Sequence, residues 1–196
     1  VFKIYPYTHN SFNFIKSQIP ITIKFNNGFG TGQHSTTQGC LIAIEKVKKI
    51  RKIINILEIG SGSGILTIAL KKLFNTKVTS TESDSQAYQA SINNFIENKI
   101  NKKINFFFQS SISNSKIKKN SPYDLIVANI LANPIIKFST EISSISKKNT
   151  ILILSGFNYD QYLRIINIYR YLGFVYIEHF NLDSWITLIL KKRKNI

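Results

Sequence analysis

Several residue types are scarce in this 196-residue chain, and each scarcity excludes a class of protein. Cysteine occurs once, at Cys40, which excludes an internal disulfide framework and a metal site built from cysteine clusters. The longest apolar runs, such as 151–154, are far shorter than the ~20 residues of a membrane-spanning helix. No charged and then apolar leader opens the sequence, so we expect no export signal. The lone thiol favours a reducing compartment, and we therefore expect a cytoplasmic protein without membrane contact.

Acidic residues are also few, 10 against 26 Lys and Arg, so the formal net charge is +16. Such a surplus is typical of proteins that contact nucleic acid or the ribosome. The alternative, which we favour here, is a compositional bias, because Lys far outnumbers Arg and the lysines are scattered along the chain. Methionine is missing altogether, including an initiator, which suggests a fragment or a lost start.

Strand-like and helix-like segments alternate along the chain, a pattern typical of an α/β sheet with crossover helices. We predict strands at 53–59, 77–82, 104–109, 124–128 and 150–155. We predict helices at 37–50, 64–74, 84–98, 134–146 and 159–172, with Asp84 as an N-cap and Gly173 as a C-terminal stop. The polar stretch 110–121 is predicted to be a surface loop.

Two further strands, 174–180 and 184–190, flank the short turn Asn181-Leu182-Asp183, and so short a connection joins antiparallel neighbours. The prediction is a doubly wound, seven-stranded, mostly parallel sheet that ends in an antiparallel hairpin. This arrangement resembles the Rossmann-like fold of methyltransferases, whereas half of a dinucleotide-binding dehydrogenase would continue with parallel crossovers. Residues 1–27, with two strand-like pieces, are predicted as a lead-in segment to a domain at 28–196.

The segment Glu58-Ile59-Gly60-Ser61-Gly62-Ser63-Gly64 runs from an apolar strand through a glycine turn into a helix. Glycines such as Gly60 and Gly62 let the backbone bend sharply and let a ligand approach where a Cβ would clash. Ile65 breaks the G-x-G-x-x-G spacing of a nicotinamide site, while acidic-x-G-x-G-x-G is met in full, which favours S-adenosylmethionine. Glu58 suits the ammonium group of that cofactor, directly or through water. The alternative is a phosphate-binding or purely structural turn.

Glu82 ends the next predicted strand, 22 residues after Gly60. An acidic side chain at this place is suited to the ribose hydroxyls of a nucleoside cofactor. The alternative is that Glu82, like Asp84, only opens the following helix.

Asn129 ends the predicted strand that contains the run Tyr123-Asp124-Leu125-Ile126-Val127-Ala128. Ligands collect at this carboxyl edge of a sheet. The amide oxygen of Asn129 can accept a hydrogen bond from a substrate amine, although loop asparagines often make only local turns.

A fourth segment, Phe29-Gly30-Thr31-Gly32-Gln33-His34-Ser35-Thr36-Thr37, precedes the first core strand. Two glycines among polar residues suggest a lid or a wall of the site. His34 is a candidate base, although a lone histidine is more often structural.

In this order the four segments resemble the ribosomal protein L11 methyltransferase family (PrmA), for which F-G-T-G-x-H-x-T-T is highly specific, and the likeness spans nearly the whole chain. It implies an S-adenosylmethionine-dependent protein methyltransferase that modifies α-amino and lysine amino groups of that ribosomal protein. Cofactor contacts then fall on Thr37, Gly60, Gly62, Glu82 and Asn129, and Asn129 also orients the attacking amine. The strand end Ser155-Gly156 looks like a family landmark. In-line transfer needs alignment and a neutral amine, so we expect no metal and no covalent intermediate.

This sequence departs from the family in two respects. Glu82 stands where the family usually has Asp, and members carry a smaller N-terminal domain that grips the ribosomal protein. We expect residues 1–27 to be the remnant of a linker to that domain. The rival functions are lysine methylation of another protein, of the electron-transfer flavoprotein subunit type, RNA methylation, and a cofactor-binding relic without activity. RNA methylation lacks support in the residues after Asn129, Ile130-Leu131-Ala132, which include no aromatic ring to stack on a flipped base.

Overall fold

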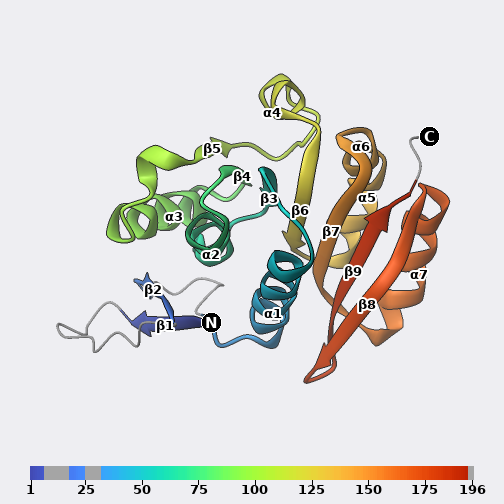
Figure 1. Cartoon of the computed structure of the whole chain (residues 1–196), viewed down its shortest axis with the longest axis horizontal. Helices are drawn as coiled ribbons and strands as arrows, with labels where there is room; N and C mark the ends of the chain where they lie inside the picture. The colour runs from blue at the N-terminus through green and yellow to red at the C-terminus, as the bar shows by residue number, and fades with distance from the viewer. Residues whose placement is uncertain (7–17, 25–31, 194–196) are drawn as a thin grey trace.

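The computed structural model describes residues 1–6, 18–24 and 32–193, and these form a seven-stranded sheet with helices on both faces and a separate two-stranded sheet (Figure 1). The order of the large sheet is β5-β4-β3-β6-β7-β9-β8. Its strands are β3 (Asn55–Ile59), β4 (Lys77–Glu82), β5 (Asn105–Phe108), β6 (Tyr123–Asn129), β7 (Ser146–Asn158), β8 (Phe174–Leu182) and β9 (Trp185–Lys192). The helices are α1 (Ser35–Ile50), α2 (Ile65–Phe74), α3 (Ser85–Glu97), η1 (Asn101–Lys103), α4 (Ser115–Asn120), α5 (Ala132–Lys137), α6 (Ser139–Ser144) and α7 (Tyr159–Tyr171).

The predicted fold class is confirmed. Strands β3 to β7 pair in parallel, and β9 pairs antiparallel with both β7 and β8. The hairpin therefore folds back so that β9 enters between β7 and β8. Asp84 caps α3 by accepting from the Ala87 amide at 2.8 Å, and Gly173 takes the left-handed conformation after α7, as predicted.

Three local predictions were wrong. The turn predicted at Asn181-Leu182-Asp183 is formed by Asp183 and Ser184, because β8 extends to Leu182 and β9 begins at Trp185. The stretch 110–121 was predicted as a loop, but its second half forms α4, because Asn114 caps the first turn and Ile117, the one apolar residue of α4, is fully buried. The predicted helix 134–146 is divided at Phe138 into α5 and α6, and β7 already begins at Ser146. One buried isoleucine in a polar run is too weak a signal for a helix, and two short adjoining helices resemble one longer helix in sequence.

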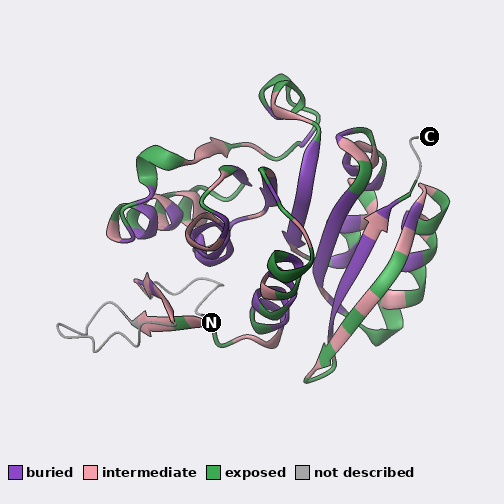
Figure 2. Cartoon of the chain, in the orientation of Figure 1, coloured by how far each residue is buried: buried purple, intermediate pink, exposed green. Residues whose placement is uncertain are grey.

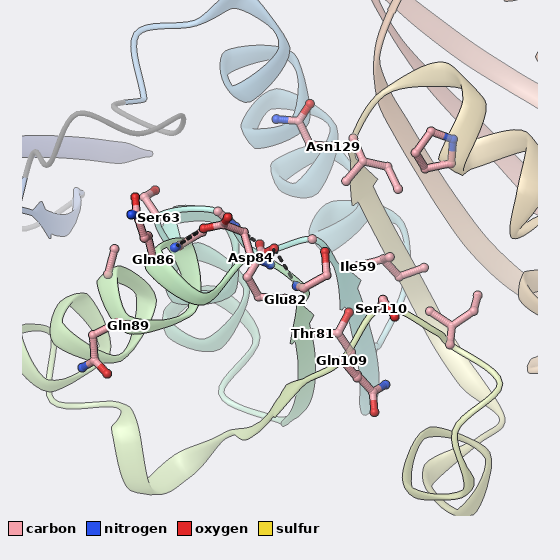
Figure 3. A pocket seen from close by; sticks show the side chains of 18 of the residues that line it. Ile59, Ser63, Thr81, Glu82, Asp84, Gln86, Gln89, Gln109, Ser110 and Asn129 are labelled. Atoms are coloured by element: carbon pink, nitrogen blue, oxygen red, sulfur yellow. Dashed lines mark hydrogen bonds between the residues drawn. The ribbon is translucent and has the colours of Figure 1, made fainter.

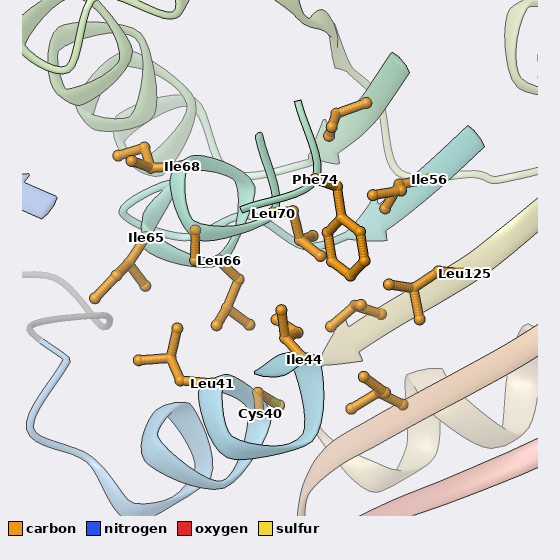
Figure 4. Packing of buried hydrophobic residues seen from close by; sticks show 14 of the residues in the cluster. Cys40, Leu41, Ile44, Ile56, Ile65, Leu66, Ile68, Leu70, Phe74 and Leu125 are labelled. Atoms are coloured by element: carbon orange, nitrogen blue, oxygen red, sulfur yellow. The ribbon is translucent and has the colours of Figure 1, made fainter. Parts of the chain in front are cut away.

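Helices cover both faces of the sheet, so both faces are buried. Successive strand residues point to opposite faces and therefore lie in different cores. Ile56 faces the core under α1 and α2, while its neighbour Leu57 faces the core under α4 to α7. Figure 4 shows the first of these cores, in which Leu41 and Ile44 of α1 meet α2 and the sheet. Figure 2 shows the resulting distribution, with the central strands buried and the outer faces of the helices exposed. No helix in the described ranges is long and apolar enough to cross a membrane.

The two strand-like pieces predicted near the start form β1 (Phe2–Pro6) and β2 (Ile19–Ile23), which pair in parallel. Ile21 and Ile23 of β2 are buried in the core under α1 and α2. The amide of Asn98 brackets Thr22, accepting from its N–H at 3.1 Å and donating to its carbonyl at 2.7 Å. Strand β2 thus packs on α2 and α3, and the division at residue 27 stays a prediction.

Glu58 is a buried carboxyl between β3, β4 and α2, only 1% exposed. Its Oε2 accepts hydrogen bonds from Ser80 Oγ at 3.0 Å and from Thr67 Oγ1, whereas Oε1 has no partner among the described residues. Burial raises the pKa of Glu58 to about 7, although the two hydroxyl groups act in the opposite direction. The folded protein therefore favours the neutral form of this carboxyl below about pH 7.

Glu58→Gln should remove a pH dependence of stability. Because the pKa of Glu58 is higher in the folded state than in the unfolded state, folding takes up a proton between about pH 4.5 and 7, and stability falls as the pH rises through this window. The advantage of the wild type over the variant in free energy of unfolding should decrease by about 2–3 kcal/mol from pH 5 to pH 8. Urea denaturation across this range measures it, with the exposed Asp160→Asn as control. Parallel stability curves for wild type and Glu58→Gln would contradict the assignment.

Candidate active site

The carboxyl ends of β3, β4, β5 and β6 surround a cavity of about 840 Å³ (Figure 3). The strand order reverses between β3 and β6, with β4 and β5 on one side and β7 on the other. Crevices at such reversal points are where doubly wound sheets bind their ligands. The volume lies within the range of small-molecule sites.

The glycine turn after β3 forms one wall of this cavity. Gly60, Gly62 and Gly64 have φ values of 75°, 57° and 82°, the left-handed region that favours glycine. A Cβ on Gly60 would overlap the side chain of Ile130. The turn is fixed to β4, because the N–H groups of Gly60 and Ser61 both donate to the Thr81 carbonyl at 3.0 Å. Helix α2 follows without a side-chain cap, and the lining of the cavity reaches Ser63, directly before its N-cap Gly64.

Glu82 lines the cavity beside this turn and is 8% exposed. Its Oε2 accepts from the Gly62 N–H at 2.7 Å, and its Oε1 accepts from the N–H groups of Ser83 at 2.7 Å and Asp84 at 3.0 Å. One carboxylate therefore joins the glycine turn to the segment that leads into α3. Oε2 keeps a lone pair for a further donor in the cavity.

Asn129, at the end of β6, lines the same cavity from the side of α1 (Figure 3). Its Nδ2 donates to Thr37 Oγ1 at 3.5 Å, and its Oδ1 accepts no hydrogen bond from the described residues. Thr37, in the first turn of α1, is 1% exposed and does not line the cavity. The structure thus brings Gly60, Gly62, Glu82 and Asn129 together around one space, and Thr37 reaches it through Asn129.

His34 has a structural role in this structure. It is the N-cap of α1, where its Nδ1 accepts from the Thr36 N–H at 3.3 Å and lies 2.8 Å from Thr36 Oγ1. Its ring meets the edge of Trp185 with the centroids 5.1 Å apart. Helix α1 begins at Ser35, two residues before the predicted start. Residues 29–31 of the predicted lid lie outside the described residues.

The end of β7 fixes the segment that follows Asn129. Ser155 pairs with Asn129 in register, and its carbonyl accepts from the Ile130 N–H at 3.1 Å. Gly156 has φ of 96°, and a Cβ there would overlap the backbone of Ile130. The landmark Ser155-Gly156 is therefore a place where two backbones approach closely.

Sequence reasoning missed part of the cavity wall and misplaced one acid. The cavity wall also includes three residues that follow β5, namely Gln109, Ser110 and Ile112. Pro134 and Phe138, which come after β6, line it as well. The signal available for the first three was their position directly after a parallel strand, where ligands bind. Glu58 does not line the cavity, so a contact between Glu58 and a bound ligand would need a bridging water.

Comparison with known proteins gives consistent relationships. The model of the family described as ribosomal protein L11 methyltransferase (PrmA) matches residues 2–193. The ribosomal protein L11 methyltransferase of Caulobacter sp. (strain K31) is 33% identical over 176 residues, which are 90% of this chain and 60% of that protein. The chain spans about 60% of the length of the curated relatives that it matches.

Solved structures show the same relationship. A ribosomal protein L11 methylase from Lactobacillus delbrueckii subsp. bulgaricus superimposes with a TM-score of 0.86 at 26% identity, covering 98% of this chain and 94% of that one. An O-methyltransferase from Bacillus cereus in complex with SAH has a TM-score of 0.65 at 16% identity, covering 83% of this chain and 84% of that one, and shares the fold. The match over almost all of its residues means that this chain belongs to the ribosomal protein L11 methyltransferase family.

Proposed function

We propose that this chain is a protein methyltransferase that binds S-adenosylmethionine in the cavity and methylates amino groups of ribosomal protein L11. The observation that carries this proposal is the arrangement of the cavity, with the glycine turn and Glu82 on one wall and Asn129 on another. The family supports the substrate, and the SAH complex of a protein with the same fold supports the cofactor.

The residues present fit this cofactor. Gly60 and Gly62 line the cavity with positive φ and no side chain to obstruct it, and the N–H groups at the start of α2 suit a carboxylate. The remaining lone pair of Glu82 suits the ribose hydroxyls, and Gln109 and Ser110 would take the edge of the adenine. When bound, S-adenosylmethionine supplies a methyl group already activated by its sulfonium.

The protein then has to position a neutral amine and to exclude competing orientations. The hydrogen bond from Asn129 Nδ2 to Thr37 fixes the amide, which leaves Oδ1 as an acceptor for the N–H of the incoming amine. Among the described residues, the carboxylates that line the cavity, Glu82 and Asp84, already accept backbone N–H groups, and His34 caps α1. Proton loss to solvent is therefore the simplest route.

Methyl transfer from labelled S-adenosylmethionine tests the function directly. Purified ribosomal protein L11 should become labelled, whereas RNA and the electron-transfer flavoprotein subunit should not. Label on RNA would support the rival nucleic-acid activity, and binding of S-adenosylhomocysteine without any transfer would support the inactive relic. The residue after Asn129 does not favour RNA methylation, because Ile130 has no aromatic ring on which a flipped base could stack.

Asn129→Ala should lower turnover about 100-fold, since the amine loses the group that orients it, while the affinity for S-adenosylhomocysteine changes less than about threefold. Single-turnover kinetics and calorimetry measure the two effects, with the exposed Asn101→Ala as a matched control. A comparable loss in both quantities would reassign Asn129 to cofactor binding alone.

Glu82→Gln should weaken the binding of S-adenosylhomocysteine by about tenfold or more, because a charged acceptor of the ribose hydroxyls is lost. The sharper test compares S-adenosylhomocysteine with its 2′-deoxy analogue by calorimetry. The wild type should prefer the hydroxylated ligand, and this preference should shrink in the variant. If wild type and Glu82→Gln prefer the hydroxylated ligand to the same degree, Glu82 does not bind the ribose. Its role would then be limited to the hydrogen bonds that connect Gly62 with Ser83 and Asp84.

A further inference from the structure

The edge of the sheet opposite the cavity forms one continuous surface. It consists of the starts of β3, β4, β6 and β7 and the end of β9, which runs in the opposite direction. Asp124 Oδ2 accepts from the N–H groups of Ile54 and Asn55 at 3.1 Å, and Thr76 Oγ1 donates to the Ile54 carbonyl at 2.6 Å. The guanidinium of Arg51 donates to the Asn149 carbonyl. Segments far apart in sequence are thus held side by side at this edge.

Cations project from each of these segments. We call the surface that they form the basic edge, and define it by Arg51, Lys52, Lys77, Lys119, Lys148 and Arg193. All of them except the half-buried Arg51 are exposed. Four lysines and two arginines from segments that are far apart in the sequence therefore lie along one edge of the sheet.

Little negative charge balances the basic edge. Asp124 is its acid, and it lies 3.8 Å from Arg51 Nη2 and 2.7 Å from Lys147 Nζ. Burial would raise the pKa of Asp124, but hydrogen bonds from Lys147, Ile54 and Asn55 outweigh it and hold the pKa below its usual value. Within the described ranges, Lys52, Lys77, Lys119 and Lys148 make no ion pair.

Helix dipoles explain only part of this arrangement. Lysines in the last turn of a helix, such as Lys48, Lys49 and Lys119, are favoured by the negative end of the macrodipole. Lys77, Lys148 and Arg193 stand outside the helices. The opposite edge is more balanced, because the charged residues that line the cavity are the two acids Glu82 and Asp84 and one lysine, Lys24.

We propose that the basic edge binds the phosphate backbone of a folded RNA, on the side of the molecule opposite the cavity. Adjacent strands lie about 4.8 Å apart, so cations on successive segments form a row that can follow several phosphates. Flexible lysines suit phosphate contacts that position a protein without reading bases. The choice of RNA rests on the proposed function, because a ribosomal protein is found together with RNA.

The test measures the binding of a fluorescent RNA hairpin by anisotropy at several salt concentrations. The triple variant Lys52→Glu, Lys77→Glu, Lys148→Glu should bind at least about tenfold more weakly at 50 mM salt, with a shallower dependence of log affinity on log salt by about three. The milder triple change to Gln guards against misfolding and should give a smaller loss in the same direction. The affinity for S-adenosylhomocysteine should stay unchanged in both.

A matched control reverses three exposed cations elsewhere, Lys3→Glu, Lys137→Glu and Arg164→Glu, with the same change in net charge. This control should retain most of the RNA affinity. An equal loss in the control would show that net charge alone attracts RNA and would overturn the proposal, as would tighter binding to polyglutamate, anionic vesicles or a DNA hairpin. A wild type that binds S-adenosylhomocysteine but not RNA would refute this inference and leave the proposed function intact.

Discussion

The close approach of Ile130 to two glycines is the constraint on which the rest of the site depends. Its side chain occupies the space beside Gly60 that a Cβ would fill, and its backbone passes against Gly156 at the end of β7. Because both glycines have positive φ, neither position tolerates another residue without strain. The turn after β3, the end of β6 and the end of β7 are therefore held in one arrangement, and Asn129, directly before Ile130, takes its place from it.

Glu82 connects this arrangement to the other side of the cavity. Its carboxylate accepts from the Gly62 N–H and from the segment that opens α3, so a single side chain holds together two walls that meet at the cavity. The reach of glutamate, one methylene longer than aspartate, is compatible with this bridge. Glu82 therefore both holds the glycine turn in place and lines the cavity. A ligand that binds to this carboxylate would also act on the geometry of the turn.

The order of strands and helices could be predicted from sequence because both faces of the sheet are buried, so that strands such as 151–154 form unbroken apolar runs between helix-like segments. The lining of the cavity could be predicted in part where the residue type and its position after a parallel strand coincide, as at Gly60, Gly62 and Glu82. It could not be predicted where the role depends on distant neighbours. Gln109 and Ser110 have no pattern of their own, Ile117 is one apolar residue in a polar run, and the capping role of His34 depends on the start of α1.

The two edges of the sheet, at the carboxyl and the amino ends of its parallel strands, differ in charge. In a parallel sheet with crossover helices, the amino edge gathers helix C-termini, where lysines are favoured, as in the last turns of α1 and α4. The first turns of α1 to α5 carry no acid, so the opposite edge has no matching concentration of negative charge in its helices. At the amino edge the enrichment in cations extends to residues outside the helices, such as Lys77 and Lys148, while Asp124 is occupied in holding β3 and pairing with Lys147. Attraction of a polyanion would therefore orient the molecule with its cavity facing away from the phosphates.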